Sequence, residues 1–82
     1  MAAEVYILII TKYGTKKEVS EKLLNFENIE NIHELYGQYD IIIKIKSESM
    51  EKLEEFIHNN IRNIPEIEAT ETLVISDVPK PD

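Results

Sequence analysis

The sequence contains no cysteine, only two glycines and a single arginine, and each scarcity restricts what the protein can do. Without cysteine the chain forms no disulfide, thiolate zinc site or iron–sulfur cluster, and it has no thiol nucleophile. Two glycines are too few for a phosphate-binding loop built from glycine amides. Association with other chains is therefore one of the few remaining ways to stabilise a chain of 82 residues.

Positive charge is scarce as well. Nine lysine and arginine residues stand against 16 acidic residues, which gives a net charge of −7. A protein that binds nucleic acid by neutralising phosphates needs a clustered excess of basic residues. We therefore expect no direct nucleic-acid partner, although Lys16 and Lys17 form a small local basic patch.

Long apolar runs are also missing. The run Val5–Ile10 is far shorter than the roughly 20 residues that a membrane-spanning helix needs. The segment before it has an acidic residue, Glu4, where a signal peptide has basic ones. We expect a cytoplasmic protein with no membrane partner, built from one domain over residues 1–78 and a polar tail over 79–82.

Apolar periodicity predicts four strands and two helices. Strands are expected at residues 4–11, 32–36, 40–46 and 67–75, which are rich in β-branched side chains. A first helix is expected after Thr15, which forms a capping-box pattern with Glu18. A second is expected from a cap at Ser47 or Ser49 to Ile61, with apolar residues at the helical period.

This order of elements is typical of the ferredoxin-like βαββαβ fold of the α+β class, a four-stranded antiparallel sheet with two helices on one face. The run Val5–Ile10 is apolar at every position instead of alternating, so it needs cover on both sides of the sheet. We therefore predict a homodimer formed through the face that the helices leave open, because an isologous interface needs only one self-complementary patch.

Side chains suited to catalysis or metal binding are few. His33 and His58 are the only histidines, and neither has a second ligand at metal spacing, so ordinary surface or strand roles are favoured. No Ser-His-Asp arrangement or paired-carboxylate pattern is visible. We expect no catalytic residue, no metal site, no cofactor and hence no enzyme.

Two segments carry more information. Tyr36-Gly37-Gln38-Tyr39-Asp40 places an acid where a turn passes into a strand, next to a glycine that permits close approach of the backbone. Thr70 and Thr72 are two residues apart in a strand and therefore share a face. Ordinary turn and strand roles remain an equally weighted interpretation of both segments.

Read together, these motifs resemble the RAM domain (regulation of amino-acid metabolism) of the Lrp/AsnC family of prokaryotic transcription regulators. The resemblance runs from about Val5 to Ile75. Gly37–Asp40 is similar to the Gly-x-aromatic-Asp turn of the family, and Thr70–Ile75 to its closing strand. Ser49–Leu53 and Ile64-Pro65 also fall where the family has its second helix and the following proline.

The chain departs from the family pattern in two turns and in extent. Tyr13-Gly14 stands where Pro-Gly is frequent, and Glu66 follows Pro65 where glycine is common. Full-length members carry an N-terminal helix-turn-helix domain before the first strand, where this chain begins. It therefore resembles the stand-alone members of the family.

The resemblance implies amino-acid binding, effector sensing and control of assembly. The carboxylate of Asp40 would bind the ligand ammonium, while the hydroxyls of Thr70 and Thr72 and the amides of Gly37–Tyr39 would bind its carboxylate. Tyr39 would add an apolar wall. In the family such sites lie between dimers of higher oligomers, and full-length Lrp/AsnC regulators become candidate partners.

Two other functions fit the same topology. One is a small dimeric α+β barrel enzyme, a cofactor-free oxygenase or isomerase, for which only His33, Asp40 or a tyrosine is available as the catalytic acid or base. The other is a purely structural association domain whose ligand site has lost its role.

Overall fold

The computed structural model describes residues 2–81. The expected bounds of domain and tail include residues 1 and 82, which lie outside the described residues. The elements, in chain order, are β1 (Ala3–Thr11), α1 (Lys16–Leu23), β2 (Ile29–Glu34), β3 (Ile41–Ser47), α2 (Met50–Phe56), the π-helical segment η1 (Ile57–Ile61) and β4 (Ile67–Val74).

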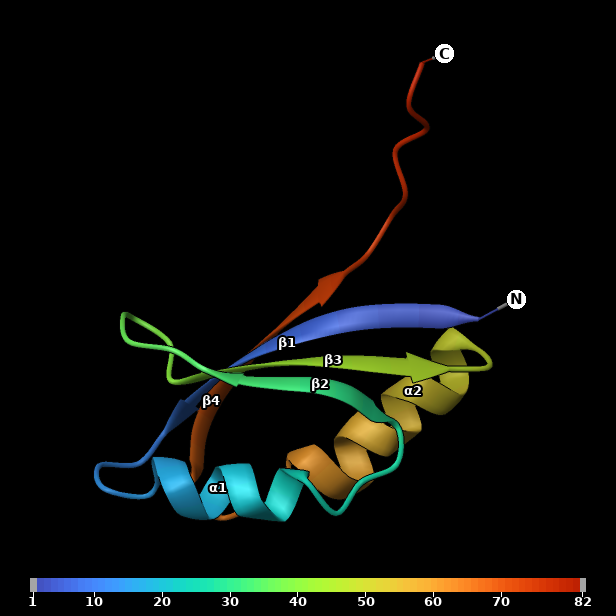
Figure 1. Cartoon of the computed structure of the whole chain (residues 1–82). Helices are drawn as coiled ribbons and strands as arrows, with labels where there is room; N and C mark the ends of the chain where they lie inside the picture. The colour runs from blue at the N-terminus through green and yellow to red at the C-terminus, as the bar shows by residue number, and fades with distance from the viewer. Residues whose placement is uncertain (1, 82) are drawn as a thin grey trace.

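The four strands form one antiparallel sheet in the order β2-β3-β1-β4. Both helices lie against the same side of this sheet (Figure 1). The predicted ferredoxin-like α+β fold is therefore confirmed. After β4 the chain extends away from the body of the domain (Figure 1), and none of the helices in residues 2–81 has the length and apolarity needed to span a bilayer.

The core lies between the helices and one face of the sheet. Every second residue of β1 and β3 points into it, as the period of a strand requires. The fully buried apolar residues are Val5, Ile7, Ile9, Ile41, Ile43 and Ile45 from the sheet, with Val19, Leu23, Leu53 and Ile61 from the helical side. The rings of Phe26 and Phe56 meet edge to face, 5.4 Å between centroids, where α1 and α2 end.

The second strand begins earlier than the sequence predicted, at Ile29 instead of Ile32. A bulge between Ile29 and Asn31 is the reason, because Ile29 pairs with Ile45 and Ile32 with Ile43 despite their odd spacing. The extra residue places both isoleucines opposite inward-facing partners. This break in the alternation conceals the start of the strand in the sequence.

The two helix starts differ from each other. The capping box at Thr15 does not form: the Thr15 hydroxyl accepts no bond from a helix amide, and it donates to the Lys12 carbonyl at 2.7 Å. At the second helix the Ser49 hydroxyl accepts from the Lys52 amide at 3.2 Å, which confirms one of the two predicted caps.

The second helix changes its period halfway, where the sequence predicted one regular helix. It is α-helical to Phe56 and continues as a π-helix over Ile57–Ile61, closed by the Arg62 amide donating to the Ile57 carbonyl at 3.0 Å. The Asn60 side-chain amide donates to the Phe56 carbonyl at 3.1 Å. The wider turn keeps Ile57 and Ile61 in the core.

Candidate functional site

The sheet face opposite the helices is open and carries an apolar centre. The register places Tyr6 of β1 beside Lys44 and Leu73, and Leu8 beside Ile42 and Glu71. Tyr6 is 38% exposed and Leu73 is 43% exposed, while Leu8 and Ile42 are half-buried. We call Tyr6, Leu8, Ile10, Ile42 and Leu73 the open-face patch. The predicted apolarity of β1 on both sides of the sheet is thus realised in the fold.

Gly37 lies in the exposed connection between β2 and β3. Its backbone φ is not positive, in contrast to Gly14 with φ 77°. A methyl group at Gly37 would meet no atom within 4 Å among residues 2–81. The folded chain alone therefore does not require glycine here, and any need for it would come from something that approaches this turn from outside.

Asp40 is the best-anchored of the predicted site residues. Its Oδ2 accepts hydrogen bonds from the Thr11 amide at 2.8 Å and the Thr11 hydroxyl at 3.2 Å. Thr11 itself is 7% exposed and ends β1. The two bonds fix the orientation of the carboxylate, and its side chain remains 28% exposed.

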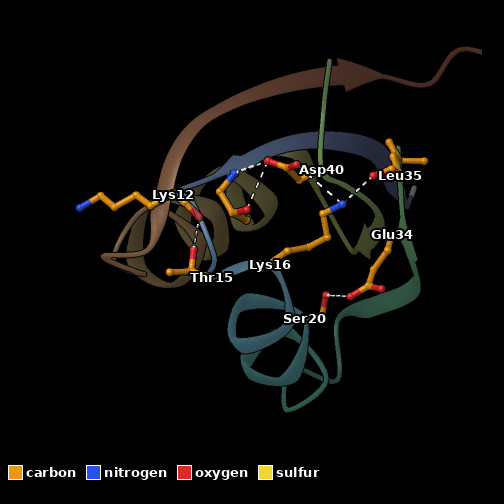
Figure 2. A network of polar contacts seen from close by, with 8 residues as sticks. Lys12, Thr15, Lys16, Ser20, Glu34, Leu35 and Asp40 are labelled. Atoms are coloured by element: carbon orange, nitrogen blue, oxygen red, sulfur yellow. Dashed lines mark hydrogen bonds and ion pairs between the residues drawn. The ribbon is translucent and has the colours of Figure 1, made fainter. Parts of the chain in front are cut away.

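A lysine from the start of α1 reaches the same carboxylate. The Lys16 Nζ lies 3.8 Å from Asp40 Oδ1 and donates to the Leu35 carbonyl at 2.8 Å (Figure 2). It also lies 4.5 Å from the centroid of the Tyr36 ring. Segments distant in sequence, the first turn of α1 and the β2–β3 connection, are thereby joined around one ammonium group.

Tyr39 points to a different part of the molecule from Asp40. Its hydroxyl donates to Glu71 Oε2 at 2.9 Å. Glu71 is paired with Leu8, so this bond lies on the open-face side of the sheet. The hydrogen bond to the Glu71 carboxylate raises the pKa of Tyr39, because losing the phenol proton would break the bond and place two negative charges together.

We expect Glu71→Gln to lower the pKa of Tyr39 toward its ordinary value of 10.0, and ¹³C NMR of labelled tyrosine would measure the change. A raised pKa in the folded chain means that this bond stabilises the fold fully below pH 10.0. The contribution disappears as the pH rises through the folded-state pKa. Glu68→Gln, at another exposed acid of β4, is the control and should leave Tyr39 unchanged.

Thr70 and Thr72 share a face, as predicted, and it is the face toward the helices. They pair with Ile9 and Ile7, both buried on that side. Thr72 lines a groove of about 440 Å³ between β4 and the second helix, together with Leu53. Because β1 lies between β4 and β3, the backbones of the threonines are about two strand spacings, roughly 10 Å, from the start of β3, where Asp40 lies. Within one chain the predicted site residues therefore form separate groups.

Comparison with known proteins assigns the family. The family model for the Lrp/AsnC ligand binding domain matches residues 4–82. The chain belongs to the Lrp/AsnC family. HTH-type transcriptional regulator FL11 of Pyrococcus abyssi is 36% identical over 70 residues, which are 85% of this chain and 46% of that protein. Regulatory protein AsnC of Escherichia coli K12 is 34% identical over 77 residues, 90% of this chain and 49% of AsnC.

The solved structures agree with the sequence relatives. The crystal structure of FFRP-DM1 is similar with a TM-score of 0.87 and 35% identity, covering 90% of this chain and 99% of that chain. This Lrp/AsnC domain spans about half the length of the curated relatives it matches. The first of those relatives is named as a transcriptional regulator and the second as a regulatory protein.

Neither histidine of this Lrp/AsnC domain is among the residues that contact Asp40. His33 is exposed and pairs with Ile42, so it belongs to the open side of the sheet, while His58 is exposed on the second helix. Within residues 2–81 no three acidic or histidine side chains gather as a metal site would require. Of the catalytic candidates named for the enzyme interpretation, His33, Asp40 and the tyrosines, His33 lies on the open side of the sheet and not between the helices and the sheet.

Sequence reasoning missed the partners of Asp40. Thr11 reads as the last residue of a strand, and Lys16 as part of a solvated helix face. The signal for Thr11 was available, since a polar residue ended an otherwise apolar run at an inward position. No comparable signal marks Lys16, whose contacts with Leu35 and Asp40 arise only from the fold.

Proposed function

We propose that this Lrp/AsnC domain is a non-catalytic effector-sensing module that binds an α-amino acid and changes its assembly on binding. The observation that supports this function most directly is the Asp40 carboxylate. It is held in one orientation by Thr11, stays partly exposed, and already faces an ammonium group. An anion fixed in this way is suited to the ammonium of a zwitterion.

One chain places only some of the donors proposed for the ligand carboxylate beside Asp40. The amides of Gly37–Tyr39 are adjacent to it in sequence, whereas Thr70 and Thr72 lie beyond β1. We propose that a neighbouring copy supplies the threonine side of the site. Because Tyr39 points away from Asp40 of its own chain, we propose that its ring forms the apolar wall only in the assembled site. Ligand binding then favours the assembled form, because the complete site exists only there.

The proposed unit of assembly is a homodimer through the open-face patch, with dimers associating further. An isologous contact covers the half-buried Leu8 and Ile42 of both copies at once. Full-length Lrp/AsnC regulators have the equivalent domain and are the proposed protein partners. We expect the domain to act with them in the cytoplasm, without contacting nucleic acid or membrane itself.

Calorimetric titration of the protein with each of the twenty amino acids at millimolar concentration tests this function. We expect at least one to bind, and we expect that one to shift the sedimentation profile toward a larger species. Binding of none would contradict the sensing role. Binding without a change in sedimentation would contradict the control of assembly.

A further inference from the structure

The ammonium group of Lys16 is surrounded by three kinds of group that recognise ammonium. The Leu35 carbonyl accepts its hydrogen bond at 2.8 Å, the Asp40 carboxylate supplies opposite charge at 3.8 Å, and the Tyr36 ring lies 4.5 Å away at its centroid. A carbonyl, an anion and an aromatic face together satisfy the charge and the donors of a primary ammonium. These groups are thus suited to a cation at a corner that is open to solvent, where Tyr36 is 93% exposed.

We propose that these groups form a binding site for an exogenous primary ammonium, that Lys16 occupies this site in the unliganded chain, and that Lys16 thereby competes with the ligand. The inference rests on the proposed function and deepens it. It names Lys16 as the residue that sets ligand affinity, and it adds Leu35 and Tyr36 to the ammonium end of the site, which the family resemblance assigned to Asp40 alone.

The geometry of Lys16 favours displacement over permanent occupation. Its nitrogen is 3.8 Å from Asp40 Oδ1, whereas a charge-assisted hydrogen bond between such groups is about 2.8 Å long. A free ammonium, unconstrained by a helix, can approach Oδ1 more closely. Thr11 bonds only to Oδ2, so the anchoring of the carboxylate survives the exchange.

Lys16 can also leave without disturbing the core. It is the first residue of α1, and its side chain is 28% exposed. Rotation of its flexible stem is sufficient to move the nitrogen into solvent. The same rotation breaks the contact with the Leu35 carbonyl, so that ligand binding loosens the link between α1 and the β2–β3 connection.

Chemical rescue tests the ammonium site without any amino acid. In Lys16→Ala we expect ethylammonium chloride to raise the melting temperature by about 4 °C more than an equal concentration of tetramethylammonium chloride, which has no N–H donor. Lys17→Ala, at the adjacent exposed lysine, is the matched control and should respond equally to the two salts. Equal responses in Lys16→Ala would overturn the inference.

The competition is tested with Lys16→Met, which keeps the apolar stem and removes the charge. For the amino acid that the unaltered protein binds, we expect this variant to bind about tenfold more tightly if Lys16 fills the site nine-tenths of the time. Lys17→Met should bind as the unaltered protein does. Weaker or unchanged binding by Lys16→Met would overturn the role of Lys16 as a competitor.

The two experiments separate the inference from the proposed function. One outcome is that ethylammonium rescues Lys16→Ala while neither the unaltered protein nor Lys16→Met binds any amino acid. That outcome would support the ammonium site and contradict amino-acid sensing. The ligand would then be sought among amines that lack a carboxylate. Amino-acid binding without rescue would support the proposed function and overturn the site described here.

Discussion

Leu8→Glu is expected to leave the chain folded and to weaken its self-association by roughly 100-fold or more, about 2.7 kcal/mol. Leu8 lies on β1 in the middle of the open-face patch, between Ile42 and Glu71 on the neighbouring strands. In an isologous dimer the substitution buries two carboxylates without partners, and burying an unpaired charge is strongly unfavourable. In the isolated chain the same side chain is only half-buried and can reach water.

Sedimentation equilibrium over a range of concentrations would measure the change, and circular dichroism would verify the fold. Leu24→Glu provides a matched control, because Leu24 is 71% exposed at the end of α1 on the opposite side of the sheet. We expect Leu24→Glu to associate like the unaltered protein. Equal association of the two variants would show that the dimer does not use the open face.

The parts of the fold that follow from local periodicity could be predicted from the sequence. The alternation of Ile41, Ile43 and Ile45 defines an inward face because a strand has a period of two. The continuous apolarity of β1 predicted a second, outward apolar surface, and Tyr6 and Leu8 form part of it. Both predictions depend only on residues within one element.

The features that were wrong or missing depend on specific contacts that the apolar period of one element does not define. The bulge after Ile29 is defined by pairing with β3, and the π-helical turn is accompanied by a bond from the Asn60 side-chain amide to the Phe56 carbonyl. Thr15 has the sequence of a capping residue, yet its hydroxyl donates to the Lys12 carbonyl and accepts no bond from a helix amide. Local propensity does not determine which nearby backbone group a hydroxyl will bond.

The candidate site also has features that the sequence predicts and features that only the fold reveals. A carboxylate at position 40, where a turn enters a strand, could be identified from the sequence as a candidate ligand. The hydrogen bonds from Thr11 and the neighbouring Lys16 could not be identified from the sequence, because these residues come from separate segments that only the fold brings together. Conversely, the sequence placed Thr70 and Thr72 on one face correctly but could not indicate that β1 lies between them and Asp40.

The contacts of Asp40 also determine how its role in binding has to be tested. In Asp40→Ala the amide of the buried Thr11 loses its acceptor, which we expect to lower the free energy of unfolding by about 1–3 kcal/mol. Asp40→Asn keeps an oxygen for that amide and loses only the charge facing Lys16. Because that ion pair is partly exposed, we expect Asp40→Asn to lower the free energy of unfolding, measured in urea, by less than about 1 kcal/mol.

The two Asp40 substitutions should differ in their effect on stability and agree in their effect on amino-acid binding. Both variants lack the anion proposed to hold the ligand ammonium, so we expect each to bind the amino acid about a hundredfold more weakly in calorimetry, about 2.7 kcal/mol. Asp77→Asn, at an exposed acid in the segment after β4, is the control and should alter neither quantity. Binding by Asp40→Asn at the affinity of the unaltered protein would remove Asp40 from the ligand site and leave it as the residue that anchors the end of β1. Loss of binding in Asp40→Asn with stability preserved would separate the two roles of Asp40. Its bonds to Thr11 would then stabilise the turn, and its negative charge would bind the ligand ammonium.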